Sequence, residues 1–309
     1  VFRTYGVLTR EAGFYFYFSR KIRELRESGH EGTARAYASS LRSMQRYLGK
    51  KDFPFIKLSS RIISDYQGKL LASGICDNTI GFYLHNIKAL FRKGCREMGL
   101  ELPCPFRDIS IKTKKTLKRS LDPVVIKTLS AIELEKDSPL SLARDIFMFS
   151  FYTRGMSFVD IALLKKRHVF PGEICYRRHK TDQLMRVGIN KEISRILERY
   201  KNVPGEYIFP LFPAERDPYA GYRNAYHRIR YSLGKISRVI GLEFPLRLHA
   251  ARHSWATIAK VNGASVHVIG ECLGHTSEKT TRIYLKELDH SALDAVNNQV
   301  ADFILAVDD

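Results

Sequence analysis

Residues 248–284 read LHAARHSWATIAKVNGASVHVIGECLGHTSEKTTRIY, and this stretch decides how the C-terminal half of the chain is interpreted. Trp255 and Ile258 give its first part the apolar side of a helix. The glycine at position 274 predicts the end of a second, short helix. The pair Thr280–Thr281 predicts the start of the next one. We therefore expect consecutive helices joined by short turns.

Four chemically active side chains lie within this stretch. His249 and Arg252 are three residues apart, so a helix places them on the same side. The turn after Gly274 presents His275, and Tyr284 follows nine residues later. Guanidinium and imidazole groups bind phosphate oxygens, and neighbouring cations favour the phenolate of a tyrosine whose ordinary pKa is about 10. The set predicts attack of a tyrosine on a phosphodiester.

The composition favours a globular protein with a polyanionic partner. The chain has 309 residues, 44% of them hydrophobic, and a net charge of +19. This length corresponds to one large or two ordinary domains, and the charge favours nucleic acid as a partner. A basic protein with no such role is the alternative. No apolar run approaches the roughly 20 residues of a membrane span, and no signal peptide is recognisable, so we expect a cytoplasmic protein.

The cysteines and histidines do not predict a disulfide framework or a metal site. The five cysteines form no CxxC pair, and their odd number favours reduced thiols. The ten histidines show no HExxH-type spacing. We expect neither a metal ion nor another cofactor.

Residues 1–111 are predicted to form a helical domain. A first helix is expected to open at Thr9 or Arg10, and Gly29 and Gly32 separate it from a second. Ser59 or Ser60 is expected to be the N-cap of a third helix, and Asp77 or Asn78 that of a fourth. Cations on the polar faces are candidates for phosphate contact, with solvated surface charges as the alternative: Arg35, Arg42, Lys88 and Arg92.

A basic linker is predicted at residues 112–120, which include the run KTKKTLKR. A cationic linker between two domains can lie across a DNA backbone, although a soluble hinge has the same composition. The candidate DNA contacts here are Lys114, Lys115, Lys118 and Arg119.

Residues 121–309 are predicted to form a second domain that is mainly α with a small β-sheet (α+β). Asp122 followed by Pro123 predicts a helix start. The apolar run at 140–164 predicts one buried helix, and residues 173–189 predict a strand pair with a turn near 181–183. Further helices are expected at 215–241 and 291–306. The last is amphipathic and is expected to dock in its own domain or on a neighbouring protomer.

Three motifs resemble those of the tyrosine recombinases, the integrase family of bacteria and phages. His249-Ala250-Ala251-Arg252 matches the family's HxxR, Leu273-Gly274-His275 matches its LGH, and Tyr284 matches its nucleophile. The resemblance implies a SAM-like core-binding domain at 1–111 and a catalytic domain at 121–309. It implies double-stranded DNA as partner, a 3′-phosphotyrosyl intermediate, and a homotetramer on two DNA sites from a protein that is monomeric or weakly oligomeric when free.

A fourth motif is similar to the family's hairpin lysine. Arg178-His179-Lys180-Thr181 matches the pattern Arg-x-Lys-Thr. The resemblance implies that Lys180 protonates the 5′ oxygen as it leaves, a role worth about 10²–10⁴-fold in rate. A surface lysine on a hairpin is the alternative.

One motif departs from the family. Residues 153–160 read TRGMSFVD, so Ser157 fills the position of the family's first arginine. Arg154 lies three residues earlier, which on a helix is one turn, or about 4.5 Å along the axis. The stretch resembles a variant in mobile elements of gut anaerobes, which also read TRGMSF. We hypothesise that Arg154 supplies the guanidinium; the alternative is a structural Arg154 and a site with one arginine.

Two other functions are compatible with these motifs. A type IB topoisomerase shares the chemistry, although HxxR, LGH and the two-domain length favour a recombinase. A DNA-binding relative without catalysis is the second, and the displaced first arginine supports it. Among recombinases, the chain length favours inversion or resolution at short repeats over integration that uses arm-type sites. The amino-acid sequence does not identify the DNA sequence that is recognised.

Overall fold

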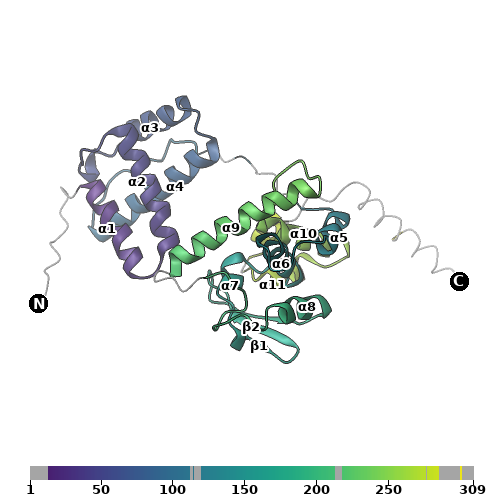
Figure 1. Cartoon of the computed structure of the whole chain (residues 1–309). Helices are drawn as coiled ribbons and strands as arrows, with labels where there is room; N and C mark the ends of the chain where they lie inside the picture. The colour runs from purple at the N-terminus through teal and green to yellow at the C-terminus, as the bar shows by residue number, and fades with distance from the viewer. Residues whose placement is uncertain are drawn as a thin grey trace, which may run out of the picture. The chain divides into compact units, whose positions relative to one another are not determined.

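The structure, a computed structural model, describes residues 13–111, 114, 120–212, 218–275, 277–284 and 300. These residues are mainly helical and include one three-stranded sheet, which confirms the predicted fold class. The chain divides into two compact units, residues 1–116 and 117–309, and each has its own hydrophobic core (Figure 1). Within the described ranges, no helix is long and apolar enough to span a membrane.

The first unit is a helical bundle around an aromatic core. Phe14, Tyr17 and Phe55 are almost completely buried in it. The predicted opening of the first helix at residues 9–10 lies outside the described residues, and Gly32 lies inside the second helix rather than before it. The unit contains α1 (Phe14–Glu27), α2 (Glu31–Leu48), a 3₁₀ turn (Phe55–Lys57), α3 (Ser60–Ala72) and α4 (Asp77–Glu97).

Helix starts in both units follow from capping side chains. The hydroxyl of Ser59 accepts from the backbone N–H of Ile62 and caps α3. The carboxylate of Asp122 accepts from Val124 N–H, with Pro123 as the first residue of α5. Both starts confirm their predictions. The fourth helix begins at Asp77 and its N-cap is Cys76, so the predicted cap at Asp77 or Asn78 was wrong by at least one residue.

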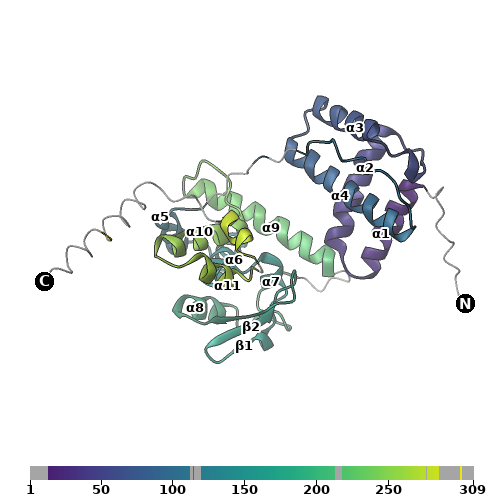
Figure 2. The same ribbon diagram turned by 180° about the vertical axis from the view of Figure 1, so that it is seen from behind.

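The second unit packs α6 against α9 and α10, as Figure 2 shows from behind. The helix predicted at 291–306 lies outside the described residues except for Val300. The helices of this unit are α5 (Pro123–Ala131), α6 (Pro139–Tyr152), α7 (Phe158–Ala162), a 3₁₀ turn (Lys166–His168), α8 (Lys191–Arg199), α9 (Pro218–Val239), α10 (Leu248–Val261), α11 (Val266–Leu273) and α12 (Glu278–Tyr284).

The apolar run at 140–164 is two helices, so the prediction of one long helix was wrong. α6 ends at Tyr152 and α7 starts at Phe158. Between them Arg154 and Gly155 have φ angles of 60° and 75°, which are left-handed and end a right-handed helix. The hydroxyl of Ser150 donates to the carbonyl of Met156 at 2.8 Å and closes the loop.

The sheet consists of β1 (Val169–Phe170), β2 (Glu173–Arg177) and β3 (Leu184–Gly188) in the order β1-β2-β3, all antiparallel. β2 and β3 confirm the predicted strand pair, and Cys175 lies opposite Arg186. Ile174, Tyr176, Met185 and Val187 face the core. The two-residue β1 was not predicted because it is too short to show alternation.

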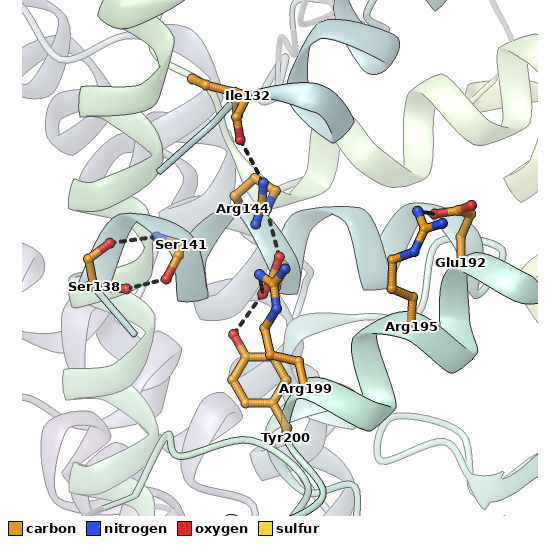
Figure 3. A network of polar contacts seen from close by, with 9 residues as sticks. Ile132, Ser138, Ser141, Arg144, Glu192, Arg195, Arg199 and Tyr200 are labelled. Atoms are coloured by element: carbon orange, nitrogen blue, oxygen red, sulfur yellow. Dashed lines mark hydrogen bonds and ion pairs between the residues drawn. The ribbon is translucent and has the colours of Figure 1, made fainter. Parts of the chain in front are cut away.

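A buried carboxylate fastens α8 to α6 (Figure 3). Asp145 accepts from Arg144 Nε at 2.6 Å, from Arg199 Nη1 at 2.7 Å and from the Tyr200 hydroxyl at 2.9 Å. Arg144 also donates to the carbonyl of Ile132 at 2.8 Å. Burying a charge is costly unless it is paired and hydrogen-bonded, as this one is. The network thus holds the helix that follows the sheet against the central helix of the unit.

Candidate active site

Arg252 on α10 is the central buried cation of the second unit. Only 5% of its surface is exposed. Nη1 donates to the carbonyl of Gly155 at 2.8 Å, and Nη2 donates to the carbonyl of Leu273 at 2.5 Å. One carbonyl comes from the loop after α6 and the other from the end of α11. The planar guanidinium is therefore held in a defined orientation before any anion arrives.

Gly155 permits this arrangement through both its backbone and its lack of a side chain. An added Cβ would lie 2.5 Å from Cγ and 2.9 Å from Cα of Arg252. Its φ of 75° is also unfavourable for other residues. A glycine is thus required where the loop meets α10.

His275 is in contact with Arg252 and is held in one orientation. Its Nε2 lies 2.9 Å from Nη2 of Arg252, and its Nδ1 lies 2.9 Å from Oγ1 of Thr281. An arginine only donates, so Nε2 accepts and the proton resides on Nδ1. Burial, together with the charges of Arg252, Arg178 and Lys180, lowers the pKa of His275 to about 4. The imidazole is therefore neutral at pH 7.

α12 carries the candidate nucleophile. Tyr284 is the last residue of this helix, and its side chain lies outside the described part of the structure. Thr281, which contacts His275, lies one turn earlier. The helix begins at Glu278 rather than at Thr280–Thr281, so the predicted start was wrong by about half a turn. The backbone of Tyr284 therefore continues from a residue that touches the imidazole.

α11 and α12 approach closely at a glycine. An added Cβ at Gly270 would lie 2.9 Å from Oγ1 of Thr281. The carbonyl of Gly270 accepts from the backbone N–H of His275 at 2.9 Å. Gly274 ends α11 with a φ of 62°, as predicted, and turns the chain so that His275 points toward Arg252.

His249 and Arg252 line the same hollow, as their spacing on one helix predicted. The hollow has a volume of about 460 Å³. The ring of His249 is also 5.2 Å from that of His253. Besides His249 and Arg252, the hollow is lined by Ser150, Gly155, Met156, Ser157, Phe158, Val159, Tyr222, Tyr226, Arg230, Arg247 and Leu248.

The turn between β2 and β3 lies next to His275. Lys180 is exposed on this turn, and its charge contributes to the lowered pKa of His275. The guanidinium of Arg178 donates to the carbonyl of Gly274. Sequence reasoning chose Lys180 and passed over Arg178, although both belong to the same matched motif. The structure adds Arg178 as a third guanidinium at the site.

Arg154 faces the sheet and is not on a helix. Its Nη1 lies 3.4 Å from the carbonyl of Arg186 on β3. Its charge also acts on the buried phenol of Tyr176, whose pKa is raised by burial and by Asp160 and lowered in part by Arg178, Arg252 and Arg154. The argument from a one-turn helical offset was wrong because residue 154 is left-handed. The guanidinium nevertheless lies in the same electrostatic surroundings as the other two arginines.

The candidate DNA-binding residues of the first unit and the linker differ in their exposure and in their ion pairs. Arg35 is paired with Glu31 at 2.8 Å, and Lys114 is paired with Asp77 at 3.0 Å. The ammonium of Lys88 lies 5.9 Å from the ring centre of Phe106. Arg42 and Arg92 are exposed. Lys115, Lys118 and Arg119 lie outside the described residues.

A basic groove along α9 was missed by the sequence reasoning. It has a volume of about 430 Å³, and within the described ranges none of its four Lys and Arg side chains forms an ion pair. It shares Arg230 and Arg247 with the hollow at Arg252, so the two are continuous. The density of cations in the predicted helix 215–241 was the available signal. We call this surface the α9 groove: His227, Arg230, Tyr231, Gly234, Lys235, Arg238, Pro245 and Arg247.

The chain is similar to known recombinases over most of its length. It is 26% identical over 226 residues to the tyrosine recombinase XerC of Shewanella oneidensis, covering 70% of each chain. It is 24% identical over 262 residues to XerD of Pseudomonas putida, covering 82% of this chain and 86% of the relative.

Solved structures share the fold. The Tn1549 transposon integrase in complex with a circular intermediate DNA matches with a TM-score of 0.67 at 16% identity, covering 93% of this chain and 99% of that one. A λ integrase tetramer bound to a Holliday junction matches with a TM-score of 0.66 at 16% identity, covering 90% and 78%.

Two family models account for both units. The phage integrase SAM-like domain matches residues 13–107, within the first unit. The phage integrase family matches residues 120–290, which is more than half of the chain and includes HxxR, LGH and Tyr284. The chain therefore belongs to the phage integrase family, the tyrosine recombinases, whose members are enzymes that transfer DNA strands in site-specific recombination.

Proposed function

We propose that this protein cuts and rejoins duplex DNA through a covalent bond between Tyr284 and the 3′ phosphate. The contact between Arg252 and His275 carries the proposal, because it joins a fixed guanidinium to a neutral imidazole that contacts Thr281, one turn before Tyr284. A phosphate bound at this position would give the Arg252 guanidinium a negatively charged acceptor in place of its neutral ones. The same groups would stabilise the added charge on a five-coordinate phosphorus.

Each candidate residue has a distinct role in the proposed step. The phenol of Tyr284 loses its proton to water and its oxygen bonds to phosphorus, while the bond from phosphorus to the 5′ oxygen breaks. Lys180 donates the proton that this oxygen takes up. Arg252 and His249 bind the non-bridging oxygens, and His275, whose Nε2 accepts from Arg252, holds the guanidinium in place. Arg154 adds a further positive charge from the side of the sheet, and the position of Arg178 supports the same role for it.

A nicked suicide substrate tests this step. The protein should form a covalent adduct that denaturants do not dissociate and that carries the phosphate at the 3′ end of the cut strand. Tyr284→Phe should abolish the adduct, whereas Tyr207→Phe, which removes a phenol outside both the hollow at Arg252 and the α9 groove, should leave it unchanged. Adduct formation by Tyr284→Phe would refute the assignment of the nucleophile. Absence of any adduct from wild-type protein would favour a DNA-binding relative without catalysis.

We propose that the DNA backbone follows the α9 groove away from the scissile phosphate. Exposed cations supply the electrostatic part of binding, and an aromatic ring lies among them, with the ammonium of Lys235 4.8 Å from the ring centre of Tyr231. Gly234 is in the middle of the helix, where nothing lies within 4 Å of an added Cβ. Packing within the protein therefore does not require a glycine there.

Gly234 provides a sharp test of the groove. Gly234→Ala should raise the free energy of unfolding by about 0.5–1 kcal/mol through helix propensity. Gly234→Glu adds bulk and negative charge to the groove and should lower affinity for a short duplex several-fold at low salt. Gly68→Glu on α3, where an added Cβ also meets nothing, is the matched control in the other unit. Equal affinity of wild type and Gly234→Glu would remove the groove from the DNA path.

We propose inversion or resolution at short repeats, carried out by four protomers on two duplexes, as the biological reaction. The fold shared with a λ integrase tetramer on a Holliday junction supports this assembly. Plasmids with two sites in inverted or direct orientation should yield inverted or excised products. Relaxation of supercoils without recombinants would instead favour topoisomerase activity, and products that require flanking arm sites would favour phage-like integration.

A further inference from the structure

We propose that Asp160 is a positioning residue that places the Lys180 turn for protonation of the leaving oxygen, and that Ser157 orients its carboxylate. This inference rests on the proposed function of Lys180. It assigns a task to the serine that replaces the family's first arginine, and that task differs from binding phosphate.

Asp160 connects two parts of the site that are distant in sequence. Its side chain is buried on α7, with 5% of the residue exposed. Oδ2 accepts from the hydroxyl of Ser157 at 2.6 Å, and Oδ1 accepts from the backbone N–H of His179 at 2.8 Å. His179 directly precedes Lys180. The carboxylate therefore holds the peptide between Arg178 and His179, one residue before Lys180.

Among the described residues, few other contacts join the turn at residues 178–183 to the rest of the second unit. Its own backbone closes through Arg178 and Gln183, whose N–H and carbonyl are 2.9 Å apart. The Arg178 guanidinium reaches the carbonyl of Gly274 on one side. Asp160 provides the second attachment, at the backbone itself, and both Lys180 and His179 are exposed. Without this attachment the turn is free to shift, and a displacement of about 1 Å can cost 10²-fold in rate.

Ser157 makes the carboxylate available in the required orientation. It is the N-cap of α7 and its hydroxyl both accepts from Asp160 N–H at 3.4 Å and donates to Asp160 Oδ2 at 2.6 Å. This fixes the rotamer so that Oδ1 points to the turn. A charged hydrogen bond of this kind, shielded from water, is stronger than a neutral one. The left-handed residues at 154–155 place Ser157 at the start of α7.

A substrate with sulfur at the scissile 5′ position distinguishes positioning of the acid from general support of the fold. A thiol has a pKa of about 8.5, so its thiolate leaves without being protonated. On the normal phosphodiester, Asp160→Ala should form the covalent adduct at least about 10-fold more slowly, as part of the 10²–10⁴-fold effect of a general acid. On the 5′-phosphorothiolate, its rate should return to within about threefold of wild type, as that of Lys180→Ala should.

Three further variants complete the test. Asp160→Asn keeps an oxygen that can accept from His179 N–H and should recover most of the rate. Ser157→Ala leaves the carboxylate in place and should show a smaller defect, also rescued by sulfur. Asp182→Asn removes a carboxylate that is 83% exposed on the same turn and should match wild type on both substrates. If Asp160→Ala fails to fold, Ser157→Ala and Asp160→Asn carry the comparison.

The outcomes separate this inference from the proposed function. An equal defect of Asp160→Ala and Ser157→Ala on both substrates, with Lys180→Ala rescued, would overturn the positioning role and leave the function intact. A Lys180→Ala defect that sulfur does not rescue would overturn the assignment of Lys180 as the acid. Absence of an adduct from wild-type protein on either substrate would overturn the proposed function itself.

Discussion

The segment α10–α12 and the loop at residues 153–157 both contribute to the surroundings of Arg252, but by different physical means. In α10–α12 regular helices set the spacing, and His249, Arg252 and His275 follow from helical periodicity and one terminating glycine. In the loop, two left-handed residues turn the chain, and a backbone carbonyl, that of Gly155, accepts from Arg252. The functional groups of the first region are local in sequence, whereas those of the second depend on tertiary contact.

This difference has a consequence for mutation. A helix tolerates most substitutions that keep its apolar side, while the loop depends on individual backbone conformations. A change at Gly155 should therefore affect Arg252 without removing any group that binds phosphate.

The largest effect should come from Gly155→Ala. The new Cβ would collide with Arg252 and the backbone strain would cost about 1–3 kcal/mol of folding free energy. We expect adduct formation to fall by about 10²-fold or more, because the guanidinium is displaced. Gly172→Ala is the control, since Gly172 has a φ of 84° but nothing within 4 Å of an added Cβ. Similar rates for the two variants would mean that the loop does not position Arg252.

Arg154→Gly should show whether the positive charge of Arg154 matters independently of the backbone conformation of the loop. Glycine suits a φ of 60°, so the free energy of unfolding should be unchanged or raised by up to about 1 kcal/mol. If Arg154 contributes a positive charge at the scissile phosphate, adduct formation should nevertheless fall by about 10-fold or more. Arg177→Gly, on the exposed side of the neighbouring strand, is the control. A rate within a few-fold of wild type would leave Arg154 a structural residue and leave Arg178 as the candidate for the second arginine.

Thr281→Val tests whether the imidazole must be oriented by α12. The variant keeps the shape of the side chain and removes the partner of His275 Nδ1. An unsatisfied buried donor costs about 1–3 kcal/mol, and we expect a moderate loss of adduct formation, near 10-fold. Thr280→Val, in the same helix, is the control. Unchanged kinetics would show that Arg252 alone orients the ring.

The smallest effect should be a pH dependence of stability. The pKa of His275 is lowered to about 4 in the folded protein, against about 6.5 in the unfolded chain. Between these values the unfolded state binds more protons, so His275 makes stability fall as the pH decreases from about 6.5 toward 4. The thermal unfolding midpoint of His275→Gln should decline less over this window than that of wild type. Parallel declines would mean that the imidazole is not shielded.

The sequence was sufficient for most elements of the fold, and for those site residues that periodicity can place. The hairpin at 173–188 and the end of α11 at Gly274 follow from local signals. The break after Tyr152 was not predicted, because the left-handed residues Arg154 and Gly155 and the contact of Gly155 with Arg252 produce it. No pattern in the sequence indicated the role of Asp160, because its hydrogen bond from His179 joins two elements that are separated along the chain.

The guanidinium of Arg252 connects carbonyls that lie 97 residues upstream and 21 residues downstream of it. Amides of the loop and of the end of α11 should therefore exchange with deuterium as one cooperative unit, even though most of the domain separates them in sequence. Replacing Arg252 with alanine would uncouple the two, and the loop would begin to exchange ahead of the helix. Hydrogen exchange at this site should therefore report the order in which parts of the domain open.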